Sequence, residues 1–289
     1  MIPAAVEYVR ASTVDEAVTA LADAGEDAKV LAGGQSLIPL LRLRLAAPSL
    51  LVDLGGIAAL RGIREDGDQL WIGAMTPHAI VLHDPLVARY APLLAQATGT
   101  VADRQVRHLG TIGGSLAHAD PAGDLPAVAL ALDAVLEVVG PSGTRTVPAG
   151  QFFVDYLTTA LRPGEVLVAV RVPKREGWTA HYEKFNRVAQ AWALVGVAAM
   201  VRRHNGTIAE ARVGLTNMAA TPVRAAAVEE ALHGSAAEPA SVAAAAIRAA
   251  DGTNPTDDLS ASAEYRRHLV TVLTERAVLA CLGGPTDAP

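Results

Sequence analysis

The order of apolar and polar positions in the first 55 residues predicts a strand, helix, strand, helix, strand arrangement. Residues 28–32 and 50–54 are short apolar runs of the kind found in buried strands. Residues 12–16 combine a hydroxyl cap with an acidic first turn, which predicts the first helix. A second helix is expected over residues 36–45, with Ser36 as its N-cap.

The middle of the chain mixes strand-like runs with helical periodicity. Strands are expected at 69–74, 135–139 and 166–172, and helices at 77–82, 85–98 and 124–132. The segment 173–177 is polar and fits neither period, so it predicts a domain boundary. We therefore expect one domain over residues 1–175, with subdomains of about 1–55 and 56–175, and a second domain over residues 176–289.

The pattern of the second domain predicts antiparallel strands followed by helices. Strands are expected at 181–186, 193–203 and 208–216, and helices at 222–232, 239–250 and 262–282. His204-Asn205-Gly206 supplies a hairpin turn between the second and third strands. The domain is therefore predicted to be a smaller α+β unit built on a three-stranded antiparallel sheet.

Composition and charge narrow the class of protein. A length of 289 residues fits about two domains, and 51% hydrophobic residues suffice for two cores. The net charge of −6 disfavours nucleic acid as a partner. The chain has no apolar run of membrane-spanning length and no signal-peptide pattern, so a cytoplasmic protein is expected. The single Cys281 excludes an internal disulfide and a cysteine-ligated iron–sulfur cluster within this chain.

Two glycine segments carry the candidate chemistry. Gly33-Gly34 is followed by Gln35 and Ser36, and Gly113-Gly114 is followed by Ser115. Glycine permits positive φ and a close approach of the backbone to an anion, and outward-pointing N–H groups make an anion site. Two such loops could hold a pyrophosphate from both sides, although each alone could be an ordinary glycine turn. Neither matches the dinucleotide-binding or P-loop pattern, so a bound nucleotide implies a different fold.

Several segments together resemble the FAD-binding medium subunit of molybdenum hydroxylases, a group that includes aerobic carbon monoxide dehydrogenase and xanthine dehydrogenase. The FAD-pyrophosphate loops of that family resemble segments 32–36 and 111–115. The segments that flank its second loop resemble 105–107 and 124–126. Hallmarks of its C-terminal domain resemble segments 213–224 and 262–269. The resemblance covers nearly the whole chain, and the motifs follow the order of the family.

The resemblance implies both a fold and a function. The fold is α+β, a two-subdomain FAD-binding fold of the vanillyl-alcohol-oxidase (PCMH) type followed by the smaller C-terminal domain. The function is electron transfer, in which the [2Fe–2S] clusters of a small subunit pass electrons to FAD and an external acceptor removes them. The molybdenum cofactor and the clusters are then expected only on partner subunits, in a dimer of heterotrimers.

By resemblance, one set of residues is expected to bind FAD non-covalently: Val30, Leu31, Ala32, Gly33, Gly34, Gln35, Ser36, Leu37, Thr111, Ile112, Gly113, Gly114, Ser115, Asp124, Leu167, Lys184 and Trp192. Asp124 matches an acidic residue that bonds cofactor hydroxyls, but it could also cap the helix that follows it. Lys184 could instead be a solvated strand lysine, and Leu167 an ordinary core leucine. Ala191 departs from the family, because relatives commonly carry an acidic residue just before the position of Trp192.

No constellation of residues suggests a catalytic base, a nucleophile or a metal site. His118 and Asp120 are expected to shape their loop rather than to bind a metal. A stand-alone flavin oxidoreductase is an alternative, but it would need its own base and often carries histidine or cysteine near the first loop, where residues 30–44 have neither. A flavin-free scaffold is a second alternative, which the intact glycine pairs disfavour.

Overall fold

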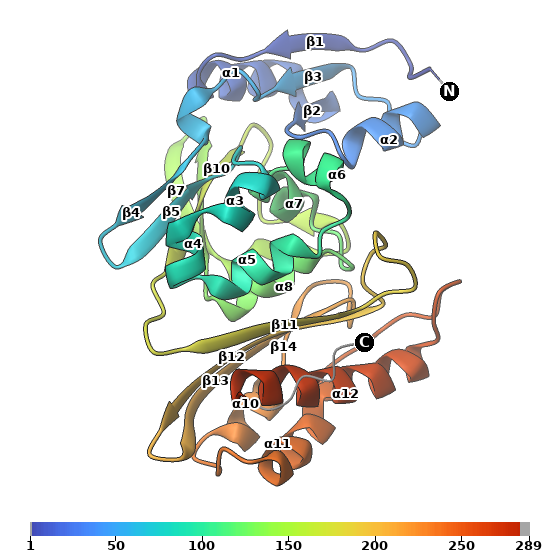
Figure 1. The fold of residues 1–289 in the computed structure, drawn as a ribbon. Coiled ribbons are helices and arrows are strands. Elements are labelled where there is room, and N and C mark those ends of the chain that lie inside the picture. The colour runs from blue at the N-terminus through green and yellow to red at the C-terminus, as the bar shows by residue number, and fades with distance from the viewer. Residues whose placement is uncertain (1, 284–289) are drawn as a thin grey trace.

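The N-terminal part of the chain forms a three-stranded parallel sheet flanked by helices (Figure 1). The computed structural model describes residues 2–283. The elements are β1 (Glu7–Arg10), α1 (Val14–Ala24), the 3₁₀ helix η1 (Gly25–Asp27), β2 (Ala28–Leu31), α2 (Leu37–Leu43) and β3 (Leu50–Asp53). The predicted order of strands and helices is confirmed. β3 lies between β1 and β2, which explains its continuous apolar sequence.

A five-stranded antiparallel sheet follows, in the order β4-β5-β10-β6-β7. Its strands are β4 (Ile63–Asp66), β5 (Gln69–Gly73), β6 (Val135–Gly140), β7 (Gly143–Pro148) and β10 (Val166–Pro173). The sequence did not predict β4 and β7, because these edge strands are largely exposed and lack an apolar run. Short elements nearby are the 3₁₀ helix η2 (Ala58–Leu60) and the hairpin of β8 (Phe153–Asp155) and β9 (Thr158–Thr159).

Short helices pack against this sheet. They are α3 (His78–His83), α4 (Pro85–Tyr90), α5 (Pro92–Gly99), α6 (Arg104–Leu109), α7 (Ile112–His118), α8 (Asp124–Ala131) and α9 (Ala149–Phe152). The prediction of one helix over residues 85–98 is wrong, because α4 ends at Tyr90 and α5 begins at Pro92. Proline has no N–H to donate and disfavours a helical residue before it, so the helix breaks there.

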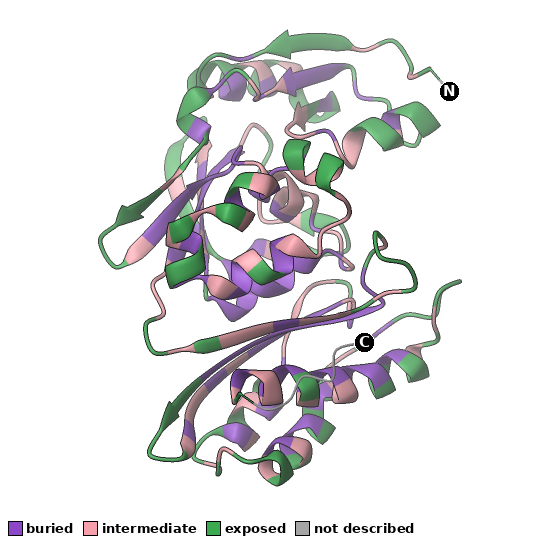
Figure 2. Ribbon diagram, viewed as in Figure 1, coloured by how far each residue is buried: buried purple, intermediate pink, exposed green. Residues whose placement is uncertain are grey.

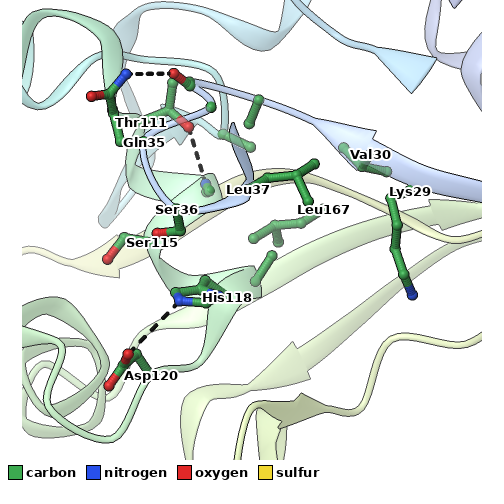
Figure 3. Close-up of a pocket in the computed structure, with 18 of the residues that line it drawn as sticks. Lys29, Val30, Gln35, Ser36, Leu37, Thr111, Ser115, His118, Asp120 and Leu167 are labelled. Carbon is green, nitrogen blue, oxygen red and sulfur yellow. Dashed lines mark hydrogen bonds and ion pairs between the residues drawn. The ribbon is translucent and has the colours of Figure 1, made fainter. Parts of the chain in front are cut away.

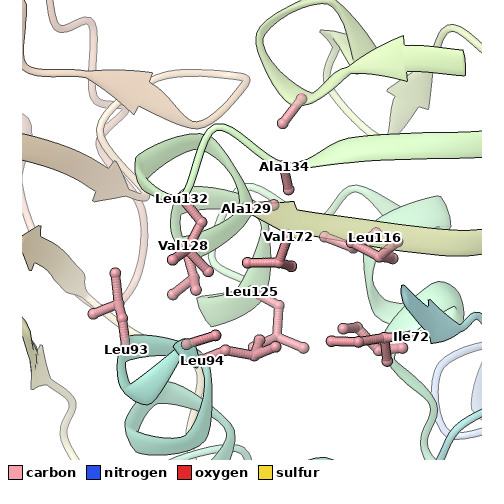
Figure 4. Close-up of a cluster of buried hydrophobic side chains, with 14 of the residues drawn as sticks. Ile72, Leu93, Leu94, Leu116, Leu125, Val128, Ala129, Leu132, Ala134 and Val172 are labelled. Atoms are coloured by element: carbon pink, nitrogen blue, oxygen red, sulfur yellow. The ribbon is translucent and has the colours of Figure 1, made fainter. Parts of the chain in front are cut away.

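The main core joins the five-stranded sheet to α5 and α8 (Figure 4). Ile72 of β5 and Val172 of β10 share a buried cluster with Leu94 of α5, with Leu125 of α8 and with Leu132, the C-cap of α8. Each of these side chains is at most 3% exposed. Burying an aliphatic side chain of this size contributes about 1.5–3 kcal/mol, so this cluster holds the helices against the sheet.

The C-terminal part contains a second antiparallel sheet, in the order β11-β12-β13-β14. Its elements are β11 (Thr179–Phe185), β12 (Val195–His204), β13 (Thr207–Thr216), β14 (Val223–Arg224), α10 (Ala226–Leu232), α11 (Pro239–Ala246), the 3₁₀ helix η3 (Ile247–Ala250) and α12 (Ala263–Cys281). The sheet has four strands rather than the predicted three, because residues 223–224 pair with β13 before α10 begins. The predicted hairpin turn is confirmed, with φ of 48° at Asn205 and 80° at Gly206.

The C-terminal sheet lies between two layers of helices, with α5 and α8 on one face and α10 and α12 on the other (Figure 1). Residues 195–201 of strand β12 are therefore buried on both faces (Figure 2). Its Ala198 and Met200 join the main core, whereas Val197 and Ala199 join a separate core with α12. The segment 173–177, where we expect the domain boundary, connects β10 to β11, and residues 284–289 lie outside the described part.

Within residues 2–283, no helix combines the length with the apolar sequence needed to cross a bilayer.

Candidate functional site

A pocket of about 830 Å³ lies between several segments of the chain. Its walls include the end of β2 with residues 32–37, the region of α7, the segment 161–167 before and within β10, and residues 190–192 after β11. Figure 3 shows Val30 and Lys29 of β2, Ser115 and His118 of α7 and Leu167 of β10 around one space. The volume falls within the range of small-molecule and cofactor sites.

The first glycine segment forms an open main-chain turn between β2 and α2. Within residues 2–283, the N–H groups of residues 33–37 donate no hydrogen bond to another protein group. Gly34 has a φ of 73°, and the Gln35 side chain steadies the turn by donating to the Gly33 carbonyl at 3.0 Å (Figure 3). Ser36 occupies the predicted N-cap position of α2, but its hydroxyl makes no capping bond. This segment therefore presents unpaired donors along the pocket wall.

The second glycine segment is a helix start rather than an open loop. Thr111 is the N-cap of α7, and Gly113 and Gly114 lie in its first turn. Its N–H groups are already used: Gly113 donates to the Ala74 carbonyl at 2.8 Å and Gly114 to the Thr111 hydroxyl at 3.0 Å. Ile112 and Ser115 also donate, to the carbonyls of Thr76 and Thr111. The expectation that both segments present free main-chain donors therefore applies only to the first.

Close packing explains several of these glycines without a ligand. A Cβ added at Gly113 would lie 2.7 Å from the Ala74 carbonyl oxygen, and one at Gly33 would overlap the Leu109 carbonyl oxygen. Gly34 instead needs its positive φ, which side chains disfavour. The glycine pairs alone therefore do not argue against a flavin-free scaffold, which corrects that part of the sequence argument.

The pocket brings together nearly all of the sequence-predicted site residues. Those that line it are Val30, Ala32, Gly33, Gly34, Gln35, Ser36, Leu37, Thr111, Gly113, Gly114, Ser115, Asp124, Leu167, Lys184 and Trp192. Leu31 and Ile112 do not line it. Ile112 is buried in the main core, since its side chain points away from the free face of α7. Side chains of neighbouring residues in a turn point in different directions, so a continuous motif does not place every member in a site.

Asp124 and Lys184 form a buried ion pair between α8 and β11. Lys184 Nζ lies 2.8 Å from Asp124 Oδ2, and the Tyr182 hydroxyl donates to Asp124 Oδ1 at 2.6 Å. The two charged side chains are 6% and 4% exposed, so Lys184 is not a solvated strand lysine. Gly123, not Asp124, is the N-cap of α8. Burial raises the pKa of the Asp124 carboxyl, although Lys184 and Tyr182 both act to lower it.

Two further carboxylates at the pocket, Glu165 and Asp120, lie beside basic residues. Arg145 donates two hydrogen bonds of 2.7 Å to the Glu165 carboxylate, and this contact lowers the pKa of Glu165. His118 lies 3.8 Å from Asp120 (Figure 3). The charge of Arg145 thus offsets that of Glu165, which reduces the repulsion between Glu165 and an anionic ligand.

His78 is a pocket residue that the sequence did not single out. It lies at the start of α3, is 4% exposed, and its Nδ1 has no hydrogen-bond partner within residues 2–283. Burial and the charge of Arg107 lower its pKa to about 4, so the ring is neutral at pH 7. The only sequence signal for His78 was a histidine at the start of a short helix whose middle is apolar. Tyr182 had a better one, because it shares a strand face with Lys184 two residues away.

Two apolar residues differ in their setting. Leu167 is buried on the pocket wall within β10, whereas Trp192 is 55% exposed in the loop after β11. Ala191, beside Trp192, also lines the pocket. Within residues 2–283, no cluster of three or more histidine, cysteine or carboxylate side chains is arranged to hold a metal ion. Cys281 lies apart in the C-terminal core, where burial raises its pKa to about 12.

Comparison with known proteins assigns this fold to a family. Residues 4–175 match the family described as FAD binding domain in molybdopterin dehydrogenase. Residues 180–281 match the family described as CO dehydrogenase flavoprotein C-terminal domain. The chain therefore belongs to the FAD-binding medium subunits of the carbon monoxide dehydrogenase and xanthine dehydrogenase family, and it is an oxidoreductase subunit with an FAD-binding domain of the PCMH type.

Individual relatives agree over almost the full length. The carbon monoxide dehydrogenase medium chain of Hydrogenophaga pseudoflava is 42% identical over 96% of this chain and 97% of that protein. A solved structure of carbon monoxide dehydrogenase from that organism superposes with a TM-score of 0.96, covering 98% of this chain and 99% of that chain at 43% identity. The 6-hydroxypseudooxynicotine dehydrogenase complex subunit alpha of Paenarthrobacter nicotinovorans is 37% identical over 98% of this chain and 96% of that protein.

Proposed function

We propose that this chain binds one FAD non-covalently in the pocket and serves as the electron-exit subunit of a molybdenum hydroxylase. The observation that carries this proposal is the row of unpaired N–H groups at residues 33–37 on the wall of an 830 Å³ pocket. Such a row fits a pyrophosphate, because several main-chain donors can share one polyanion without a buried lysine or arginine.

The remaining wall fits the rest of the cofactor. Leu167 supplies an apolar contact for the flavin ring, and the Ser36 hydroxyl adds a donor beside the main-chain row. The carboxyl oxygens of Asp124 can accept from cofactor hydroxyls in addition to their bonds to Tyr182 and Lys184. Bound FAD would supply the electron-transfer chemistry, and this chain would bind it, orient it and restrict water around it.

Electrons would reach this chain from the [2Fe–2S] clusters of a small partner subunit and leave to an external acceptor. A large subunit with the molybdenum cofactor would oxidise the substrate, and the complex would be a dimer of such heterotrimers. Relatives that are 42% and 37% identical belong to complexes named for carbon monoxide and for 6-hydroxypseudooxynicotine. Similar medium subunits in complexes named for different substrates support a substrate site on another subunit.

Reconstitution with FAD tests the cofactor proposal. We expect one FAD per chain by absorbance, and acid precipitation should release all of it into the supernatant. A yellow pellet would contradict non-covalent binding. It would make His78 and His118, the histidines at the pocket, the candidates for covalent attachment. Absence of any bound FAD would contradict the proposal itself and favour a scaffold role.

Co-expression with partner subunits tests the role in electron transfer. The chain should co-purify with an iron–sulfur and a molybdenum subunit, and only the complex should oxidise an organic substrate or carbon monoxide. Turnover of such a substrate by the isolated chain at about 1–10³ per second would instead identify a stand-alone flavin oxidoreductase.

A further inference from the structure

The loop between β11 and β12, residues 186–194, covers one side of the pocket, and we call it the flap. Gln190, Ala191 and Trp192 of the flap line the pocket. Few contacts hold its outer part: the Asn186 side chain donates to the Val188 carbonyl at 2.8 Å, and Ala191 N–H donates to the same oxygen at 2.9 Å. The position of Trp192 therefore depends on how the base of the flap is held.

The base of the flap is held by two side chains from distant segments. Asn217 Nδ2 donates to the carbonyls of Ala193 and Leu194, at 2.8 and 3.2 Å. Arg266 Nη1 also donates to the Leu194 carbonyl, so this backbone oxygen accepts hydrogen bonds from both side chains. The backbone N–H of Leu194 donates to the Phe185 carbonyl at 2.8 Å, which joins the two ends of the flap. These contacts fix the backbone directly after Trp192.

Packing alone does not explain an arginine at position 266. It lies on the inner face of α12 and is 1% exposed. Its one carboxylate partner is Asp258, at 2.6 Å, and its Nε has no partner within residues 2–283. A buried guanidinium is unfavourable unless its donors are used, and an apolar side chain would fill the same volume at less cost. Its directed contact with the Leu194 carbonyl is therefore the feature that packing does not explain.

Asn217 connects the flap to a second part of the pocket wall. Its φ is 62°, and its N–H donates to the Pro121 carbonyl at 2.8 Å, next to the pocket residue Asp120. Asn217 thus joins the flap base to the segment between α7 and α8. It comes from segment 213–224 and Arg266 from segment 262–269, the two C-terminal motifs for which the pocket wall itself gives no role.

We propose that Asn217 and Arg266 are positioning residues that hold the flap over the cofactor pocket and so set the place of Trp192. Neither side chain lines the pocket, and both act through the backbone of Ala193 and Leu194. The cofactor part of this proposal rests on the proposed function, whereas the restraint of the flap does not.

Limited trypsin digestion of the ligand-free chain tests the restraint. Arg187 is an exposed cleavage site in the flap, and Arg203 is an exposed internal reference at the far end of β12. Arg266→Met should speed cleavage after Arg187 about tenfold relative to Arg203, because loss of a backbone anchor raises the open population. Arg267→Met, the exposed neighbour on the same helix, should leave the ratio unchanged.

Asn217→Gly gives an independent variant that keeps the positive φ and removes only the side-chain amide. It should also raise the cleavage ratio, even where Arg266→Met fails to fold by circular dichroism. A folded Asn217→Gly protein with the wild-type ratio would overturn the proposal, as would a folded Arg266→Met protein with that ratio.

Tryptophan fluorescence tests the link to the cofactor. FAD titration should quench Trp192, and the Trp192→Phe variant separates its signal from those of Trp71 and Trp178. Both positioning variants should lose most of this quenching and bind FAD about tenfold more weakly, with Arg267→Met as control. Unchanged quenching and affinity would refute the positioning role. A wild-type chain that binds no FAD would refute the proposed function, while the digestion result would stand.

Discussion

The two glycine segments face the same pocket with similar sequences but use their backbones differently. Residues 33–37 leave their N–H groups unpaired, whereas the N–H groups of residues 112–115 donate to carbonyls and to the Thr111 hydroxyl. Both segments precede or begin a helix, and both line the pocket. Only the first has main-chain donors to offer an anion.

This difference separates two reasons for a Gly-Gly step. In the first segment Gly34 provides a positive φ that turns the backbone donors outward. In the second, Gly113 lets α7 approach the end of β5 so closely that a methyl group would meet Ala74. A glycine pair therefore indicates close approach, but the approaching group can be the protein itself.

Substitution of these two glycines should give the largest contrast. Gly113→Ala should lower the free energy of unfolding by about 3 kcal/mol, because its Cβ would meet backbone atoms. Gly34→Ala should lower the free energy of unfolding by only about 1 kcal/mol through backbone strain. It should nevertheless weaken FAD binding more than Gly113→Ala does. Urea denaturation and FAD titration measure the two effects, with Gly150→Ala as a control whose Cβ meets only ordinary contacts. Wild-type stability of Gly113→Ala would remove the distinction between the segments.

Acid should destabilise the fold beside the second segment, because His78, whose backbone N–H donates to the Gly110 carbonyl, has a buried ring that would have to take up a proton. The folded pKa of about 4 lies below the ordinary value of 6.5, so the unfolded chain binds the extra proton. Stability is therefore complete above pH 6.5 and falls as the pH drops towards 4. His78 should account for about 2 kcal/mol between pH 7 and 4.5. Denaturation at both pH values, compared with His78→Gln, measures this share; an equal loss in the variant would rule His78 out.

The two hydroxyl residues at the helix starts give the smallest and most closely matched contrast. Thr111 caps α7 through the Gly114 N–H, so Thr111→Ala should cost about 1 kcal/mol of stability. Ser36 makes no capping bond, so Ser36→Ala should change stability by less than about 0.5 kcal/mol but reduce FAD affinity. Thermal unfolding with and without FAD distinguishes the two. Equal loss of stability in both would show that the two caps do not differ.

Local chemistry explains which elements could be predicted. The apolar run of β3 and the Asn205-Gly206 turn carry their structure in neighbouring residues, and both are confirmed. Pro92 also carried a local signal, which the apolar spacing of residues 85–98 obscured. Strand β14 had none, because two residues become a strand only by pairing with β13.

The sequence by itself determined the family, the order of most elements and the segments that meet at the pocket, because these follow from local motifs and periodicity. Only the tertiary structure decided which backbone groups stay free. The pairing of Asp124 with Lys184 and of Arg145 with Glu165 joins residues 60 and 20 positions apart. The placement of His78 and Arg266 depends likewise on which helices pack together. Such contacts are set by burial of distant surfaces against one another, and no spacing along the chain encodes them.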